Sequence, residues 1–383
     1  MKKTYIVAPA LPSQESPGAG LVAYNIARHA PHCLRIVAMQ GNLENLDFPS
    51  YVEACVLSVR HAPLSKPIKD KLYFAEDGNL FSMYAKLRAV RTSGVDMFFI
   101  KAVNDLIRFS PDLVVGHSLF ALPIGAFAKS ILRKKFVLWL HNVTESVLIS
   151  RHPFLLKLVS QADLVICISS DVQKHLTDIA PGLSTTVITT GVDLTQFSEL
   201  ALHREKQIIA VGSFKWKKGY HILLEAAARF LPQFPEYKLI IVGDGPLRGD
   251  ITAQIEQLGL VDRIQLMGIL PQDQLAILLN RSQLFVITSL YEGLPKVILE
   301  ALACGTPIVV TDACNVDEYL DGAGVIVPSN DYQAFSQAVI KMLDSPQAVW
   351  LNRSMRAVQI AKKFDWRLIG SAAWACYQSV NTE

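Results

Sequence analysis

The sequence predicts an α/β protein of two doubly wound domains, each with a parallel sheet between layers of helices. Short apolar runs alternate with helical segments along the chain, which is typical of parallel sheets covered on both faces. The alternation stops over residues 194–206 and then starts again, and 383 residues are enough for two domains of ordinary size. We expect the two halves to face each other across a cleft.

The expected domain boundaries follow from this interruption. The N-terminal domain is predicted at residues 1–195 and the C-terminal domain at residues 205–363. Residues 364–383 are predicted to form a helix that returns to the N-terminal domain.

Apolar runs bounded by turn residues mark the strands of the first half. They are predicted at residues 5–8, 35–39, 52–59, 113–117, 136–142 and 164–168, and residues 187–191 are expected to close the first half. Helices are predicted at residues 21–29 and 86–107, and the basic residues of the second favour a cationic surface helix or, more simply, a solvated helix face. Ser169 and Ser170 begin a further helix, with Asp171 in its first turn.

The second half repeats the pattern. Its strands are predicted at residues 207–211, 237–242, 264–267, 284–287, 308–310 and 325–328. Helices are predicted up to Phe230, around residues 297–302, over residues 331–343 and from Gln347 onward, with a break at residues 364–366.

Several strands of the first half end next to residues that suit a binding site, because open α/β sheets bind ligands at the carboxyl ends of their strands. The glycine loop at residues 17–20 joins the first strand to the first helix, but it is not GxGxxG and supports a dinucleotide site only weakly. His117 and His141 end two other strands. A lone histidine is more often structural, whereas two at equivalent strand ends leave both a structural and a chemical role open.

The stretch at residues 284–310 combines a strand, a turn, a helix and a second strand. It carries two carboxylates eight positions apart, Glu292 and Glu300. Pro295 suits the first helical turn, where its missing N–H is not needed, and Gly305 suits the helix end. Free N–H groups at such a helix start favour phosphate, and a carboxylate, which only accepts hydrogen bonds, suits the hydroxyls of a sugar.

The alternative is that Glu292 only complements the helix dipole and that Glu300 is solvated. Against it, Glu300 is flanked by Leu299, Ala301 and Leu302, and a carboxylate in apolar surroundings needs a partner.

A glycine-bounded turn at residues 212–219 contains Lys215, Lys217 and Lys218. Three cations beside backbone N–H groups suit a diphosphate, and the alternative is a solvated basic loop. We favour the phosphate site because the two glutamates lie in the same half of the chain.

Composition excludes several other classes of protein. With 51% hydrophobic and 19% charged residues and a formal charge of +3, the chain is predicted to be globular and not to bind nucleic acid. Residues 1–193 carry 20 Lys and Arg against 15 Asp and Glu, and residues 194–383 carry 17 against 19, which favours an anionic acceptor or a membrane surface only weakly.

Six scattered cysteines without C-x-x-C indicate reduced core residues of a cytosolic protein, not a zinc site. No apolar stretch suits a transmembrane helix or a signal peptide.

These motifs together resemble the retaining GT-B glycosyltransferases of the family 4 type, the group 1 glycosyl transferases. The likeness is strong over residues 207–330 and weak in the first half. The matching segments are residues 292–300 for E-x7-E, 212–219 for G-R-L-x-x-x-K-G, 242–246 for V-G-x-G-P, 264–268 for V-x-F-x-G, 190–193 for N-G-V-D and, more loosely, 18–20 for the N-terminal glycine loop.

The resemblance implies two Rossmann-like domains and a nucleotide-diphosphate sugar as donor, with no metal and no further cofactor. Glu292 would hold the donor sugar, His141 would lie near the anomeric centre and Lys218 would contact the diphosphate. Cationic side chains and helix N-termini would take the place of a metal. The implied donor-binding residues are Gly20, Gly212, Ser213, Lys218, Gly243, Gly293 and Leu294 with their amides near the phosphates, and Glu300 on the ribose hydroxyls.

The sequence departs from the family pattern at Ser213, where the family has an arginine. The change removes a fixed positive charge from the site of the leaving group, and Lys215 or Lys217 would substitute, although lysine is a poorer bidentate partner. The first glycine loop also lacks the double glycine of the family.

The predicted function is transfer of a sugar from a nucleotide-diphosphate sugar to a glycan or lipid-linked acceptor in cell-surface polysaccharide synthesis. The protein is expected in the cytoplasm, with peripheral contact at the inner membrane face. Two alternatives stay open: a nucleotide-sugar epimerase of the same architecture, and a non-catalytic nucleotide-sugar-binding protein, with which Ser213 is compatible. The sequence does not identify the donor base or sugar, the acceptor, the linkage or the oligomeric state.

Overall fold

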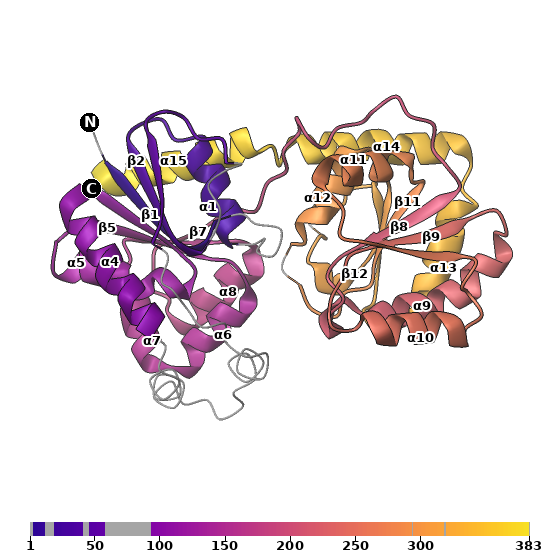
Figure 1. Cartoon of the computed structure of the whole chain (residues 1–383), viewed down its shortest axis with the longest axis horizontal. Coiled ribbons are helices and arrows are strands. Elements are labelled where there is room, and N and C mark those ends of the chain that lie inside the picture. The colour runs from indigo at the N-terminus through magenta and orange to yellow at the C-terminus, as the bar shows by residue number, and fades with distance from the viewer. Residues whose placement is uncertain are drawn as a thin grey trace. The chain divides into compact units, whose positions relative to one another are not determined.

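The chain forms two compact units, which we describe from a computed structural model (Figure 1). The structure describes residues 3–11, 19–40, 46–57, 93–292, 294–317 and 319–382. Unit 1 comprises the described residues up to Thr189 together with those from Ile369 onward, and unit 2 comprises Thr190–Leu368. The chain therefore leaves unit 1 once and returns to it for most of its last helix.

The described residues of unit 1 contain a seven-stranded parallel sheet in the order β3-β2-β1-β4-β5-β6-β7. The strand order reverses between β1 and β4, so the sheet is doubly wound and this pair flanks its switch point. The strands are β1 (Thr4–Ala10), β2 (Leu34–Gln40), β3 (Val52–Val56), β4 (Leu113–His117), β5 (Lys135–Leu140), β6 (Leu164–Cys167) and β7 (Thr185–Val187).

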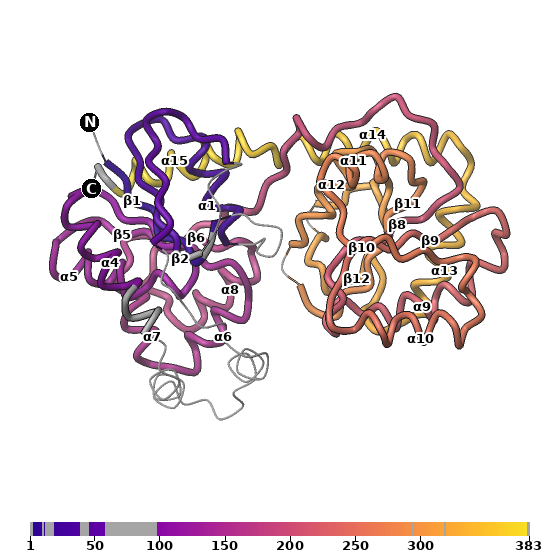
Figure 2. Tube along the Cα trace, viewed as in Figure 1, coloured from indigo at the N-terminus to yellow at the C-terminus, as the bar shows by residue number. Residues whose placement is uncertain are grey.

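Helices cover this sheet, and the last helix of the chain lies beside the first (Figure 2). The indole Nε1 of Trp374 in the last helix donates a hydrogen bond to the carbonyl of Ile26 in the first, at 2.9 Å. The described helices are α1 (Ala19–Arg28), α4 (Ser93–Phe109), η1 (Leu119–Ala121), α5 (Leu122–Ser130), α6 (Val143–Arg151), α7 (Pro153–Val159), α8 (Ser170–Ile179) and α15 (Trp366–Thr382).

The described residues of unit 2 contain a six-stranded parallel sheet in the order β10-β9-β8-β11-β12-β13, with its switch point between β8 and β11. The strands are β8 (Gln207–Val211), β9 (Lys238–Val242), β10 (Ile264–Gly268), β11 (Leu284–Ile287), β12 (Ile308–Thr311) and β13 (Gly324–Val327). The helices are η2 (Trp216–Lys218), α9 (Tyr220–Phe230), η3 (Leu231–Gln233), α10 (Arg248–Gln257), α11 (Gln272–Arg281), α12 (Lys296–Ala303), η4 (Asp312–Cys314), α13 (Tyr332–Leu343) and α14 (Gln347–Lys362).

Both faces of the unit 2 sheet are buried. Ile209 and Phe285 pack on one face with α11, α12 and α14, whereas their neighbours Ile208 and Val286 pack on the other with α9, α10 and α13 (Figure 1). Successive residues of a strand point to opposite faces, so a sheet covered on both sides needs strands that are apolar throughout. This requirement explains the continuous apolar runs in the sequence.

The predicted α/β class and the two parallel-sheet domains are confirmed. Ser169 caps α8 as predicted and accepts a hydrogen bond from the amide of Val172 at 3.4 Å. The sheet of unit 1 ends at Val187, within the segment at residues 187–191 that is expected to close the first half. The amide of Val192 then donates to the carbonyl of Phe364 in the returning segment, at 2.8 Å. Of the helix predicted at residues 86–107, the first seven residues lie outside the described residues.

Candidate functional site

The predicted site residues of unit 2 gather at one edge of its sheet. The predicted residues Gly212 and Gly243 follow β8 and β9, and Thr288, which is not among the predicted residues, follows β11, so all three lie at carboxyl ends of parallel strands. Strands β8 and β11 also flank the point where the strand order reverses, which is where open α/β sheets bind ligands.

Lys218 and Glu292 form an ion pair at this edge. Nζ of Lys218 lies 2.8 Å from Oε1 of Glu292, although not in the orientation of a hydrogen bond, and the two side chains are only 13% and 11% exposed. Nζ of Lys217 lies 3.3 Å from the same oxygen, and its side chain is 46% exposed. Two cations thus meet one carboxylate, and the remaining positive charge suits an anionic ligand.

Backbone contacts hold the loop after β8 against the loop after β11. The amide of Leu290 donates to the carbonyl of Lys217 at 2.8 Å, and the hydroxyl of Thr288 donates to the carbonyl of Gly219 at 2.9 Å. Gly219 has a φ of +63°, and a Cβ there would lie 2.1 Å from the Thr288 carbonyl oxygen. Only glycine therefore fits this close approach.

The turn after β12 fixes the backbone of Glu292. Its amide donates to the carbonyl of Ala313 at 3.0 Å, and its carbonyl accepts a hydrogen bond from Nδ2 of Asn315 at 3.0 Å. Asn315 adopts a φ of +49°, a left-handed conformation that asparagine tolerates better than most residues. Sequence reasoning missed Asn315, because its link to Glu292 is a tertiary contact.

Glu300 is buried in α12, and its partner is Lys296. Nζ of Lys296 lies 2.8 Å from Oε1 of Glu300, which is 5% exposed, so the solvated alternative for Glu300 is wrong. Sequence reasoning missed Lys296, although the i,i+4 spacing was a signal for it. Gly305 ends the helix as expected, with a φ of +68° and an amide that donates to the carbonyl of Leu302.

Gly212 and Gly243 allow the strand ends to approach each other. A Cβ on Gly243 would lie 1.9 Å from the carbonyl oxygen of Gly212, and a Cβ on Gly212 would contact the aliphatic part of Lys218 at 3.5 Å. The hydroxyl of Tyr220 donates to the Gly212 carbonyl at 2.8 Å. These contacts place the Lys218 side chain along the end of β8.

The other predicted residues are less closely connected to this pair. Ser213 is half-buried beside Gly212, and the side chain of Leu294 packs against the core under α12. Gly293 lies outside the described residues. Gly20 is buried at the start of α1 in unit 1.

His117 and His141 meet in unit 1, at the ends of the neighbouring strands β4 and β5. Nδ1 of His117 lies 3.1 Å from Nε2 of His141, and both rings stack near Trp139, with centroids 5.3 and 5.9 Å from the indole. His117 is fully buried, and its Nε2 has no hydrogen-bond partner among the described residues. Burial and the neighbouring His141 lower the pKa of His117, and burial lowers the pKa of His141 to about 3, although part of its surface remains exposed.

Glu145 joins the two loops that follow these strands. Its carboxylate accepts hydrogen bonds from the amides of Leu119 at 3.0 Å and His141 at 2.6 Å, while Asn142 caps α6 by accepting from the amide of Glu145 at 2.9 Å. Burial raises the pKa of the Glu145 carboxyl, against the lowering effect of these hydrogen bonds. Sequence reasoning missed Glu145, although N-x-x-E directly after a strand is a helix-start pattern close to a capping box.

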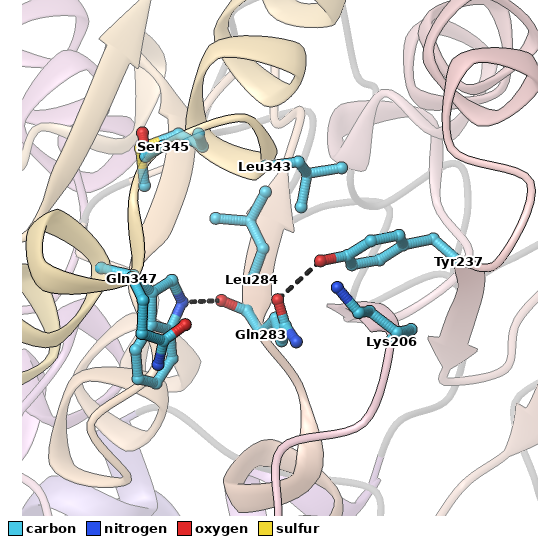
Figure 3. Close-up of a pocket in the computed structure, with 9 residues that line it drawn as sticks. Lys206, Tyr237, Gln283, Leu284, Leu343, Ser345 and Gln347 are labelled. Atoms are coloured by element: carbon cyan, nitrogen blue, oxygen red, sulfur yellow. Dashed lines mark hydrogen bonds between the residues drawn. The ribbon is translucent and has the colours of Figure 1, made fainter.

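A pocket of about 120 Å³ in unit 2 lies at the opposite, amino-terminal edge of the sheet (Figure 3). Lys206, Tyr237 and Gln283, which immediately precede β8, β9 and β11, line it together with Trp350. The hydroxyl of Tyr237 donates to Oε1 of Gln283 at 2.6 Å, and Nε1 of Trp350 donates to the Gln283 carbonyl at 2.8 Å. This pocket contains none of the predicted site residues.

No three His, Cys, Asp or Glu side chains in the described part of the chain are arranged to hold a metal ion. No helix within the described ranges has the length and apolar character needed to cross a membrane.

Two family patterns match successive parts of the sequence. Residues 79–196 match Glycosyltransferase Family 4, and residues 193–364 match Glycosyl transferases group 1. Together they span most of the chain, and the family predicted from the sequence is confirmed.

Curated relatives share part of the sequence. The chain is 28% identical over 228 residues to a glycogen synthase of Mycobacterium tuberculosis, covering 57% of this chain and 55% of that protein. It is 26% identical over 198 residues to the amylovoran biosynthesis glycosyltransferase AmsK of Erwinia amylovora, covering 49% of each. The chain thus spans about half the length of these relatives.

Solved structures share the fold over almost the whole chain. Sucrose-phosphate synthase from Thermosynechococcus elongatus superposes with a TM-score of 0.76 at 17% identity, over 99% of both chains. HepE of Anabaena in complex with UDP gives the same TM-score at 20% identity, over 99% of this chain and 100% of that one. The solved structures show that the chain has the GT-B fold, and the two family matches show that it belongs to the family 4 type of the group 1 glycosyl transferases.

Proposed function

We propose that the protein is a retaining glycosyltransferase that moves a sugar from a nucleotide-diphosphate sugar to a glycan or lipid-linked acceptor. The observation that carries this proposal is the group formed by Lys217, Lys218 and Glu292 at the switch point of the unit 2 sheet. The two ammonium groups suit a diphosphate, and the carboxylate beside them suits the hydroxyls of the attached sugar.

Lys218 and Glu292 of this group, together with Glu300, each have a proposed role in transfer. The bond between the anomeric carbon and the diphosphate breaks, and Lys218 stabilises the charge that develops on the leaving diphosphate. A bond from the acceptor oxygen forms on the same face of the sugar, and the proton of the acceptor hydroxyl passes to the departing phosphate oxygen. Glu292 orients the donor sugar, and Glu300 accepts hydrogen bonds from the ribose. In this proposal the cations do the work that a metal does elsewhere.

The relatives support a nucleotide sugar as donor and a polysaccharide as product. HepE was solved with UDP and with UDP-glucose, and AmsK is named for amylovoran biosynthesis. By this likeness we propose a role in cell-surface polysaccharide synthesis, in the cytoplasm and in peripheral contact with the inner membrane face. The excess of basic residues in the first half of the chain supports the proposed contact with a negatively charged membrane surface.

The test is a panel of UDP-, GDP- and ADP-sugars, scored first by thermal stabilisation, since a ligand of the native state raises the apparent stability. The stabilising donor is then incubated with glycan and lipid-linked acceptors, and the anomeric configuration of the product is determined by NMR. We expect stabilisation and an α-linked product from an α-linked donor. The proposal would be contradicted if Lys218→Ala and Glu292→Ala both kept full donor binding and full turnover.

A non-catalytic nucleotide-sugar-binding protein is the second candidate, and Ser213 favours it because the family arginine is missing there. It predicts stabilisation by the donor with no turnover for any acceptor. Incubating the donor alone tests the epimerase alternative in the same experiment, because an epimerase forms the epimer without an acceptor.

A further inference from the structure

His117 and His141 share one hydrogen-bonding proton. Nδ1 of His117 and Nε2 of His141 are 3.1 Å apart, so one of these nitrogens donates and the other accepts. The choice sets the tautomer of both rings, because a neutral imidazole carries a single N–H. It also decides whether Nδ1 of His141, the nitrogen not committed to His117, is a donor or a base.

The unpartnered Nε2 of His117 distinguishes the two arrangements. If His141 donates, the proton of His117 sits on Nε2, which is buried and has no acceptor among the described residues. If His117 donates through Nδ1, its buried Nε2 is only an unused lone pair. Buried N–H groups without a partner are rarer than underused acceptors, so the second arrangement is favoured.

The described residues around His141 hold its ring, and none of them forms a hydrogen bond with its Nδ1. Trp139 lies parallel to both imidazoles, with interplanar angles of 15° and 13°, and its Nε1 donates a hydrogen bond to the hydroxyl oxygen of Tyr377 at 2.7 Å. The nearby carboxylate of Glu145 accepts the backbone amide of His141. Glu145 therefore fixes the backbone, and His117 fixes the ring.

We propose that His117 is a positioning residue that holds His141 in the neutral Nδ1–H form, so that His141 presents a hydrogen-bond donor and not a base. The geometry alone carries this statement about the tautomer. The partner of this N–H rests on the proposed function: the N–H of His141 donates a hydrogen bond to an oxygen of the transferred sugar and so orients its anomeric carbon.

Histidine ¹⁵N NMR of the full-length protein at pH 7.5 tests the tautomer without any ligand. We expect the ¹⁵N shifts of His141 to show a protonated Nδ1 and an unprotonated Nε2. In His117→Phe, which removes the donor, we expect the His141 signals to move toward the Nε2–H form. His117→Asn keeps an N–H near the position of Nδ1 and is expected to retain the original form.

His175→Gln is the matched control, because His175 is a second histidine of unit 1 with a buried Nε2 that has no partner among the described residues. It is expected to leave the His141 signals unchanged. Circular dichroism checks that each variant is folded. A wild-type His141 protonated at Nε2, or His141 signals unaffected by His117→Phe in a folded protein, would overturn the proposal.

Kinetics with the best donor of the panel then separate positioning from folding. We expect His117→Phe to lower kcat by about tenfold or more with little change in donor KM, and His117→Asn to recover much of the loss. If the wild-type protein turns over no donor, the proposed function fails, but the NMR result still decides the tautomer. If turnover is normal while His141 is protonated at Nε2, this inference alone fails.

Discussion

The ammonium of Lys218 and the carboxylate of Glu292 lie 2.8 Å apart, joined at 3.3 Å by the ammonium of Lys217. The carboxylate would be costly at 11% exposure without these cations, and the cations would repel each other without the carboxylate. Each residue thus holds the others in place before any ligand arrives. The arrangement separates an inner cation, Lys218, from an outer one, Lys217.

The inner lysine is predicted to matter more than the outer one. We expect Lys218→Ala to lower kcat/KM for the donor by about 100-fold, the effect of removing one well-placed stabiliser of developing charge. Lys217→Ala removes a cation that is 46% exposed and therefore screened by solvent, so about tenfold or less is expected. Steady-state kinetics at fixed ionic strength measure both, and equal losses would contradict the distinction.

Restoring the family arginine is predicted to tighten nucleotide binding. Ser213 is half-buried next to Gly212, at the end of β8, and Ser213→Arg would add a bidentate cation near the ammonium groups. We expect the Kd of the preferred nucleoside diphosphate to fall on the order of tenfold, about 1.4 kcal/mol, by isothermal calorimetry. Ser213→Gln, which is polar and uncharged, is the control and should leave the Kd nearly unchanged. Equal effects of the two variants would show that charge at this position does not matter.

The fold, and the placement of Lys218 and Glu292 in one candidate site, could be predicted because their signals are local. Strands buried on both faces leave continuous apolar runs, and β4, β8 and β11 have the predicted bounds. Glu292 and Lys218 are predicted by the short motifs at residues 292–300 and 212–219, each of which lies within one continuous segment of the sequence. The flanking apolar residues likewise predicted that Glu300 needs a partner.

The rest depends on contacts between distant segments, which no local pattern reveals. Asn315 reaches the backbone of Glu292 only because β11 and β12 are neighbours in the sheet. Glu145 joins the loops that follow β4 and β5, and Val192 pairs with the returning chain at Phe364. Such contacts are fixed by topology and not by the residues on either side.

Gly219 is predicted to be essential for the stability of unit 2. Gly219→Ala places a Cβ 2.1 Å from the Thr288 carbonyl oxygen at a φ of +63°, and we expect a loss of at least about 2 kcal/mol in the free energy of unfolding. Gly249→Ala is the matched control, because Gly249 lies in α10 with open space around its Cβ position. It should gain up to about 1 kcal/mol from helix propensity. Urea unfolding measures both, and similar values would show that the loop after β8 adapts to a side chain.

The buried histidine pair is predicted to make the protein lose stability as the pH falls below about 6.5, the ordinary value for histidine. The folded-state pKa of His117 is lowered, so below this pH the unfolded chain binds more protons than the folded chain. The free energy of unfolding then falls with decreasing pH, and the contribution of His117 is fully present only above its unfolded pKa.

Removing His117 isolates this effect, because the other groups facing it stay in both proteins. Glu145 has a raised pKa and therefore the opposite pH dependence, His141 has a lowered one, and the raised pKa of Tyr377 keeps it neutral throughout. We expect urea unfolding of the wild-type protein and His117→Phe, in steps from pH 7.5 to 5.5, to give parallel curves above pH 7. Below pH 6.5 the wild-type curve should fall more steeply, by up to about 1.4 kcal/mol per pH unit. Curves that stay parallel down to pH 5.5 would mean that His117 already titrates normally in the folded protein, and that the imidazole pair is open to water.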